Sequence, residues 1–219
     1  MIARVRSVFT TALVLLSIAL ARPALAGPPL LCHPFDIGTA ASLPWSGQTS
    51  WFDGKADYRL ANLVADTEAL LAPTTPVVVR METLRRASIY AGRDAKVASA
   101  LLERLTAKAQ ASKAAGQPDA LALLDAAYAT EALRQITMIG GIPGFKDQIT
   151  GIKDVISNAD GWQYMKASLA ARPDDPALEF AAALIAADKD RAAYTGHAQR
   201  ARAGAAKDAL LARNLSHIS

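Results

Sequence analysis

The helical spacing of apolar residues from about residue 56 onward is the feature that most constrains how this chain can fold. In the segment 119–139, for example, Leu121, Leu124 and Tyr128 follow one another at steps of three and four residues. Such steps place side chains on one face of an α-helix. Alanine, the strongest helix former, supplies 48 of the 219 residues. We therefore expect an all-α fold.

Turn-forming residues divide this stretch into helices that pair along the chain. Thr75-Pro76 and Asp175-Pro176 are typical helix starts, with a capping side chain followed by proline at the first helical position. The one strand-like run, Val77–Val79, lies within a helical stripe. Short breaks between helices favour antiparallel packing. The expected hairpins cover residues 57–91, 94–139, 145–172 and 176–204.

The stretch 164–173 resembles the second helix of a tetratricopeptide-type repeat. Ser168, a small residue, stands five positions before the closing Pro173, and Asp174-Asp175-Pro176 then opens the next helix. The resemblance covers about residues 160–190. It then departs from the family, because Glu179, Ala182, Ala183 and Ala186 stand where the family shows a large residue, a small pair and an aromatic residue. It implies an array of helical hairpins. Units of 30–45 residues suit such an array, whose concave face commonly binds partners.

Residues 1–26 read as a secretory signal peptide. Arg4 and Arg6 precede a 14-residue apolar stretch, Val8–Ala21, and the small-residue box Ala24–Ala26 follows. The stretch is shorter than the ~20 residues that a membrane-spanning helix needs, which disfavours an uncleaved anchor. We expect cleavage after Ala26 and a periplasmic or extracellular location.

The net charge of the mature chain excludes one class of partner. Removing the signal peptide leaves 21 basic and 20 acidic residues, so the apparent excess of positive charge largely disappears. Nucleic-acid binding would require a basic patch, so we expect no nucleic-acid partner. No later stretch is long and apolar enough to span a membrane.

Residues 27–55 differ from the rest in being rich in proline and aromatic residues. Trp45, Trp51, Phe35 and Phe52 lie within 18 residues, and closely spaced prolines exclude a long helix. We expect an irregular strap that packs across the first helices, followed by a helical domain over 56–219. The alternative is an aromatic lid over a ligand, which makes Trp45 and Trp51 candidate binding residues.

Two stretches of the chain also resemble exported bacterial proteins of unassigned function. They are Pro29–Gly38 and Arg80–Arg86. The second contains Glu82 and Arg86 at a favourable i, i+4 spacing. Arg80, Arg85 and Arg86 could bind an anion, although a charged helix flank is the simpler interpretation.

No catalytic or metal-binding motif stands out. The histidines His33, His197 and His217 have no second ligand at metal-binding spacing, and Cys32 with His33 makes at most half a site. Nucleophile, phosphate-loop and haem motifs are missing from the sequence as well. We expect no metal and no cofactor.

One carboxylate constellation could support acid–base chemistry. Asp125 and Glu131 flank Tyr128 at three-residue steps, and Glu131 can pair with Arg134. The simpler interpretation is an ion-paired helix edge.

Three functional hypotheses follow. The leading one is an exported binding or scaffold module of the bacterial cell envelope, with an envelope protein as partner and no catalytic role. The alternative is a periplasmic enzyme with an acid–base site around Glu131, Asp125 and Tyr128, closed by Trp45 or Trp51. The third is a homo-oligomeric structural element, which requires a large bare apolar patch on the monomer.

Overall fold

The computed structural model describes residues 27–46 and 50–218, so the predicted signal peptide and its cleavage site lie outside the described residues. The all-α prediction is confirmed, because the only β feature in these residues is an isolated bridge between Trp45 and Gly54. The α-helices are α2 (Leu63–Leu70), α3 (Val77–Ala91), α4 (Ala95–Ala114), α5 (Ala120–Met138), α6 (Ile149–Val155), α7 (Gly161–Ala171), α8 (Pro176–Ala186), α9 (Arg191–Gly204) and α10 (Ala209–Asn214).

Aspartate side chains define the starts of most helices. The residues that cap α4, α5, α7, α8, α9 and α10 are Asp94, Asp119, Asp160, Asp175, Asp190 and Asp208. Each accepts a hydrogen bond from backbone N–H groups of its helix's first turn, which otherwise have no partner. The predicted start at Asp175-Pro176 is confirmed. The predicted cap at Thr75 is wrong, because its hydroxyl donates to the carbonyl of Leu70 and α3 begins one residue later than expected.

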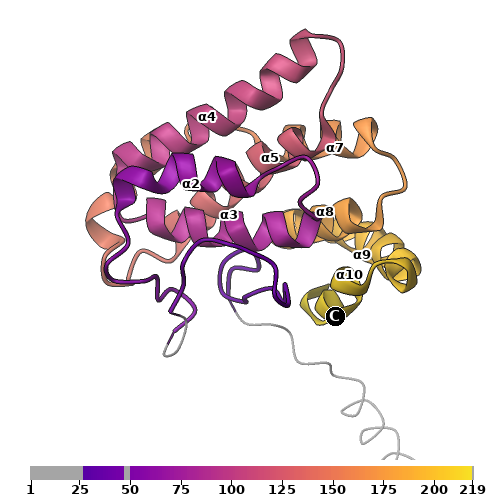
Figure 1. Ribbon diagram of the computed structural model, residues 1–219, viewed down its shortest axis with the longest axis horizontal. Coiled ribbons are helices and arrows are strands. Elements are labelled where there is room, and N and C mark those ends of the chain that lie inside the picture. The colour runs from indigo at the N-terminus through magenta and orange to yellow at the C-terminus, as the bar shows by residue number, and fades with distance from the viewer. Residues whose placement is uncertain (1–26, 47–49, 219) are drawn as a thin grey trace, which may run out of the picture.

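Three central helices form the core. Nearly every residue of α3, α5 and α8 is buried, whereas α4, α7 and α9 each bury only a narrow stripe. Runs of alanine such as Ala181–Ala183, all fully buried, let α8 approach its neighbours closely. Figure 1 shows α4 on one side of this core and the N-terminal segment on the other.

Helical hairpins organise the packing. α4 with α5 and α8 with α9 are tightly packed neighbours, and α2 packs on α3. The predicted hairpin over 145–172 is divided instead: α6 packs against α4 and α5, while α7 packs against α5. As a result, α4 and α7 lie on the same side of α5. The tetratricopeptide-like register stays a prediction.

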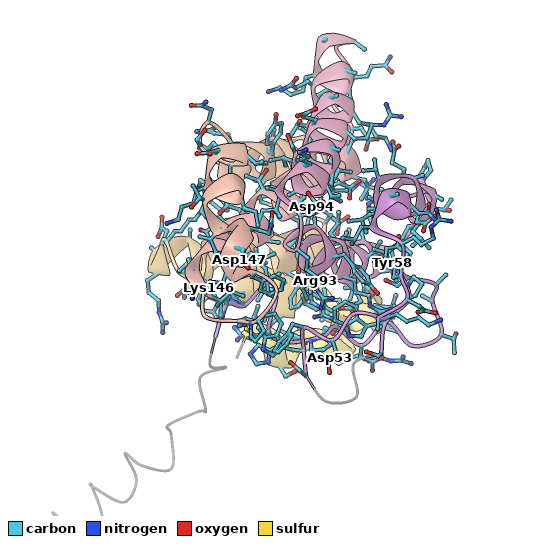
Figure 2. The ribbon with its side chains drawn as sticks, turned by 90° about the vertical axis from the view of Figure 1, so that its left-hand side faces the viewer. Asp53, Tyr58, Arg93, Asp94, Lys146 and Asp147 are labelled. Atoms are coloured by element: carbon cyan, nitrogen blue, oxygen red, sulfur yellow. The ribbon has the colours of Figure 1, made fainter. Side chains whose placement is uncertain are left out.

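The irregular segment that begins at Gly27 and ends near Lys55, here called the strap, crosses α3 and α5 (Figure 1). Its residues Leu30, Leu31 and Leu43 are fully buried. Near its end, Arg93 at the α3–α4 turn donates to the carbonyl of Phe52 at 3.1 Å. Figure 2 shows this end of the molecule, with Arg93 and Asp94 of the α3–α4 turn above Asp53 of the strap.

Side chains of the helices, rather than a β-ladder, form hydrogen bonds with backbone N–H and C=O groups of the strap. The contacts run from Gln135 and Tyr128 to Leu30, from Arg85 to Leu31 and Trp51, from Glu82 to Phe35, from Asn214 to Asp36, from Arg86 to Leu43, and from Tyr90 to Pro44 and Lys55. Buried backbone groups must be paired, so these polar side chains are what allows a segment without regular structure to be buried.

Candidate functional site

Asp125 of α5 is an internal ion-pair partner. Its carboxylate oxygens accept from Nε and Nη2 of Arg80 at 2.9 and 2.5 Å, and both side chains are about 1% exposed. Arg80 also donates to the carbonyls of Leu71 and Ala72, which ties α3 to the end of α2. Burial raises the pKa of Asp125, and the Arg80 guanidinium opposes that shift. The pair therefore joins three helices and leaves no free carboxylate for acid–base chemistry.

Tyr128 and Glu131 make separate contacts of their own. The hydroxyl of Tyr128, fully buried, donates to the carbonyl of Leu30 in the strap at 2.7 Å. Glu131 pairs through Oε2 with Lys189 and with Arg134, the latter at 3.3 Å. Its other oxygen is buried without a hydrogen-bond partner among the described residues.

The three candidate acid–base residues do not converge on a common space. Steps of three residues turn by about 60° around a helix, so Asp125 and Glu131 point about 120° apart. Their partners lie on α3 for Asp125, on the strap for Tyr128, and beyond the end of α8 for Glu131. Neither of the two clefts described below is lined by any of them.

The structure does bring Trp45 and Trp51 together. Both line a pocket of about 450 Å³ between the strap and α3, with Phe35, Glu82 and Arg86 among its other walls. Trp45 also makes cation–π contacts with two arginines. The guanidinium carbons of Arg85 and Arg86 lie 4.9 and 5.8 Å from its ring centroid.

The carboxylate of Glu82 on α3 binds both arginines and the strap. Its fully buried carboxylate accepts from Arg85, from Arg86 and from the backbone N–H of Phe35. Burial alone would raise the pKa of Glu82, but the two guanidiniums hold it below its ordinary value. The predicted i, i+4 pair of Glu82 and Arg86 is confirmed, and the strap covers the charged flank, so that Glu82 and Arg85 are fully buried.

Cys32, His33 and His217 lie near the other end of the strap. His217 stacks on Phe35 with ring centroids 4.7 Å apart and meets His33 edge-on at 6.2 Å. Burial, with the nearby His33, lowers the pKa of His217 to about 4, and burial raises the pKa of Cys32 to about 11. Across the described part of the chain, no group of three or more His, Cys, Asp or Glu side chains is arranged to hold a metal ion.

A cleft of about 880 Å³ lies between α4 and α7, with the α6–α7 connection at one end. Its apolar floor consists of Leu102, Val155, Ala159, Ala167 and the ring of Tyr164. Its polar walls are Ser99, Glu103, Thr106, Gln110, Lys113, Asp154, Ser157, Asn158, Asp160, Gln163 and Lys166.

The relative direction of α4 and α7 determines the shape of this cleft. Ser112 near the end of α4 accepts a hydrogen bond from the N–H of Asp119 at the start of α5, and Ser168 of α7 donates to the carbonyl of Ala120. At the opposite end, Gly161 of α7 lies against Glu131 of α5. Hence α4 and α7 run in the same direction, and α5, on which both pack, runs antiparallel to them (Figure 1).

One hydrogen bond crosses the cleft. The amide nitrogen of Gln110 donates to the hydroxyl of Tyr164 at 3.1 Å, which fixes the spacing of α4 and α7 at this level. Gln110 and Tyr164 were not predictable as a pair, since they lie 54 positions apart in the chain and neither belongs to a recognisable motif. A polar stripe on 99–113 at helical spacing was the only available signal.

Comparison with protein-family models, curated proteins and solved structures gives no match to this chain. Fold and surface alone therefore define its class: an all-helical protein with a buried, strap-covered face and an open interhelical cleft. Within the described residues, no helix combines the length and apolarity that a membrane span requires.

Proposed function

We propose that this protein is an exported binding module of the bacterial cell envelope, and that the α4–α7 cleft is where a segment of a partner protein docks. The observation that carries the proposal is the cleft itself. A volume of about 880 Å³ falls in the range of ligand-binding clefts, ~300–1,000 Å³. Its five apolar or aromatic lining residues can contact apolar side chains of a partner, and its polar lining residues can supply hydrogen bonds.

The fate of the acid–base candidates favours binding over catalysis. Asp125 and Tyr128 are each committed to a buried structural contact, and Glu131 is held by two cations. A general acid or base must reach a substrate proton. In these contacts, none of the three side chains is placed to reach the proton of a substrate.

A homo-oligomer receives less support. Met138, 65% exposed, is the one large hydrophobic side chain that the described surface leaves open to solvent. An assembly that depends on a bare apolar face would need several such side chains together.

The docking part of the proposal is tested by filling the cleft. Ala167 is half-buried and lines the cleft, and Ala170, one turn further along α7, is exposed and outside it. Native mass spectrometry of the protein purified gently from its own envelope fraction should show a protein adduct for the wild type and for Ala170→Trp. We expect Ala167→Trp to lose that adduct. An adduct equally abundant in both variants would contradict docking in the cleft.

The export part has its own test. The mass of the protein purified from the envelope fraction should match a chain that begins at Gly27. A chain that keeps residues 1–26 and stays in the cytoplasm would contradict this part alone.

A further inference from the structure

The charges of the α4–α7 cleft are divided between its two ends. Because α4 and α7 run parallel, the level of a residue along one helix can be matched to the other. Relative to the Gln110–Tyr164 hydrogen bond, Glu103 and Asp160 lie on the N-terminal side of α4 and α7, and Asp154 precedes them in the last turn of α6. Lys113 and Lys166 lie on the C-terminal side of that bond. Glu103 and Lys113 are ten residues apart on α4, or about 15 Å.

Helix capping explains only part of this separation. Asp160 caps α7 and Lys113 lies in the last turn of α4, where such charges stabilise helix ends. Glu103 stands in mid-helix, and Asp154 lies in the last turn of α6, where the helix dipole disfavours a negative charge. Within residues 27–46 and 50–218, no ion pair joins Asp154, Lys113 or Lys166 to another side chain.

We propose that the cleft binds a short, extended peptide segment that places a cationic side chain at its Glu103–Asp154 end and a carboxylate at its Lys113–Lys166 end. This inference rests on the proposed function and names the chemistry of the partner. Two oppositely charged ends select both the charges and the orientation of the bound segment, because the reversed orientation would place like charges together.

The dimensions of the cleft favour an extended segment over a helix. Five extended residues span about 16 Å, which matches the separation of the charged ends. A ten-residue helix of the same length and ~10 Å diameter fills on the order of 1,200 Å³. Only part of such a helix would lie within the cleft's volume of about 880 Å³, whereas an extended segment of about five residues fits along its length.

The walls also offer partners for a peptide backbone. Asn158 and Gln163 carry amide groups that can both donate and accept hydrogen bonds, and both lie at the cleft. An extended segment keeps its backbone N–H and C=O groups unpaired until such partners meet them. The apolar floor around Leu102 and Tyr164 can then accommodate the side chains between the charged ends.

A random heptapeptide display library, selected on the purified chain from Gly27 to Ser219, tests the inference while the natural partner is unidentified. We expect the selected peptides to carry Lys or Arg four or five positions from Asp or Glu. A synthetic peptide of the consensus sequence should bind about tenfold more weakly to Lys113→Glu/Lys166→Glu, because two attractive surface pairs become repulsive. The matched control, Lys146→Glu/Lys207→Glu, makes the same charge change at exposed sites outside the cleft and should leave the affinity unchanged.

Other results would overturn the inference. Selected peptides without the two-ended pattern, equal losses in both double variants, or no selected peptide at all would each contradict it. So would a consensus peptide that still binds Ala167→Trp, since it would then bind elsewhere. Each of these results is independent of the native adduct that tests the proposed function.

Discussion

Replacing Glu82 with glutamine probes the buried network that holds the strap on α3. The carboxylate accepts from Nε and Nη2 of Arg85 at 2.8 and 2.9 Å, from Nε of Arg86 at 2.7 Å and from the N–H of Phe35 at 3.0 Å. Glutamine keeps the shape of the side chain but removes the charge, and it directs an NH₂ donor at groups that are themselves donors. Arg85, fully buried, would lose its only ion-pair partner among the described residues.

The expected cost is large because a buried charge would be left uncompensated. Breaking one partner of a buried ion pair costs about 3–5 kcal/mol. For a chain of this size, each kcal/mol lowers the melting temperature by about 2–4 °C, so we expect Glu82→Gln to melt about 10 °C lower.

Urea unfolding followed by circular dichroism measures the difference in the free energy of unfolding. Glu103→Gln makes the same chemical change at an exposed position and should alter stability by less than about 0.5 kcal/mol. A loss below about 1 kcal/mol in Glu82→Gln would refute the argument that this carboxylate holds the network together.

The pH dependence of the same pair gives an independent check. The pKa of Glu82 is lowered in the folded state, so the unfolded chain takes up its proton first as the pH falls. The stabilisation is complete above the ordinary carboxyl pKa of about 4.3 and is lost as the pH falls through the lower folded value. The stability gap between wild type and Glu82→Gln should therefore narrow below about pH 4.3.

Further predictions concern packing and titration. Tyr128→Phe removes the donor to the buried carbonyl of Leu30, so we expect a loss of about 1–3 kcal/mol and faster hydrogen exchange in the strap, whereas Tyr164→Phe should leave strap exchange unchanged. Gly161→Ala would place a Cβ 2.8 Å from the carbonyl oxygen of Ala127 and should cost about 1–3 kcal/mol by thermal unfolding. Gly196→Ala, whose Cβ meets nothing closer than 3.5 Å, should instead stabilise α9 by about 0.5–1 kcal/mol. His217 has a pKa of about 4 in the folded state, below its ordinary value, so stability should fall between about pH 6.5 and 4, and His217→Phe should flatten that decline in urea titrations.

The sequence was sufficient to predict the helices because local signals specify them. The apolar spacing around Leu121 and Tyr128 predicts α5, and Asp175-Pro176 predicts the start of α8. These signals act within a few residues, so they do not depend on the rest of the fold.

The burial of charged residues on α3 could not be predicted in the same way. Charged residues follow the same helical spacing in the sequence whether they face solvent or contact an irregular segment 40 or 50 residues earlier in the chain. Arg85 illustrates this, since it lies 54 positions from Leu31, whose carbonyl it binds. The strap itself was predictable from its prolines and aromatics, but its polar anchors were not.

The cleft could not be predicted because no single segment encodes it. Gln110 and Tyr164 meet only because α4 and α7 lie on the same side of α5, which departs from the expected pairing of 145–172. The candidate acid–base triplet, in contrast, was correctly placed on one helix, but its partners came from three other elements.

The most direct test of the central claim is position-dependent photo-crosslinking in the native cell envelope. A photoreactive amino acid at Gln163 lies in the cleft, and the same amino acid at Gln199 lies exposed on α9, outside it. A partner docked between α4 and α7 predicts a discrete crosslinked product from position 163, lost in Ala167→Trp, and none from position 199. The same product from both positions, or one from position 199 only, would contradict the cleft as the docking site.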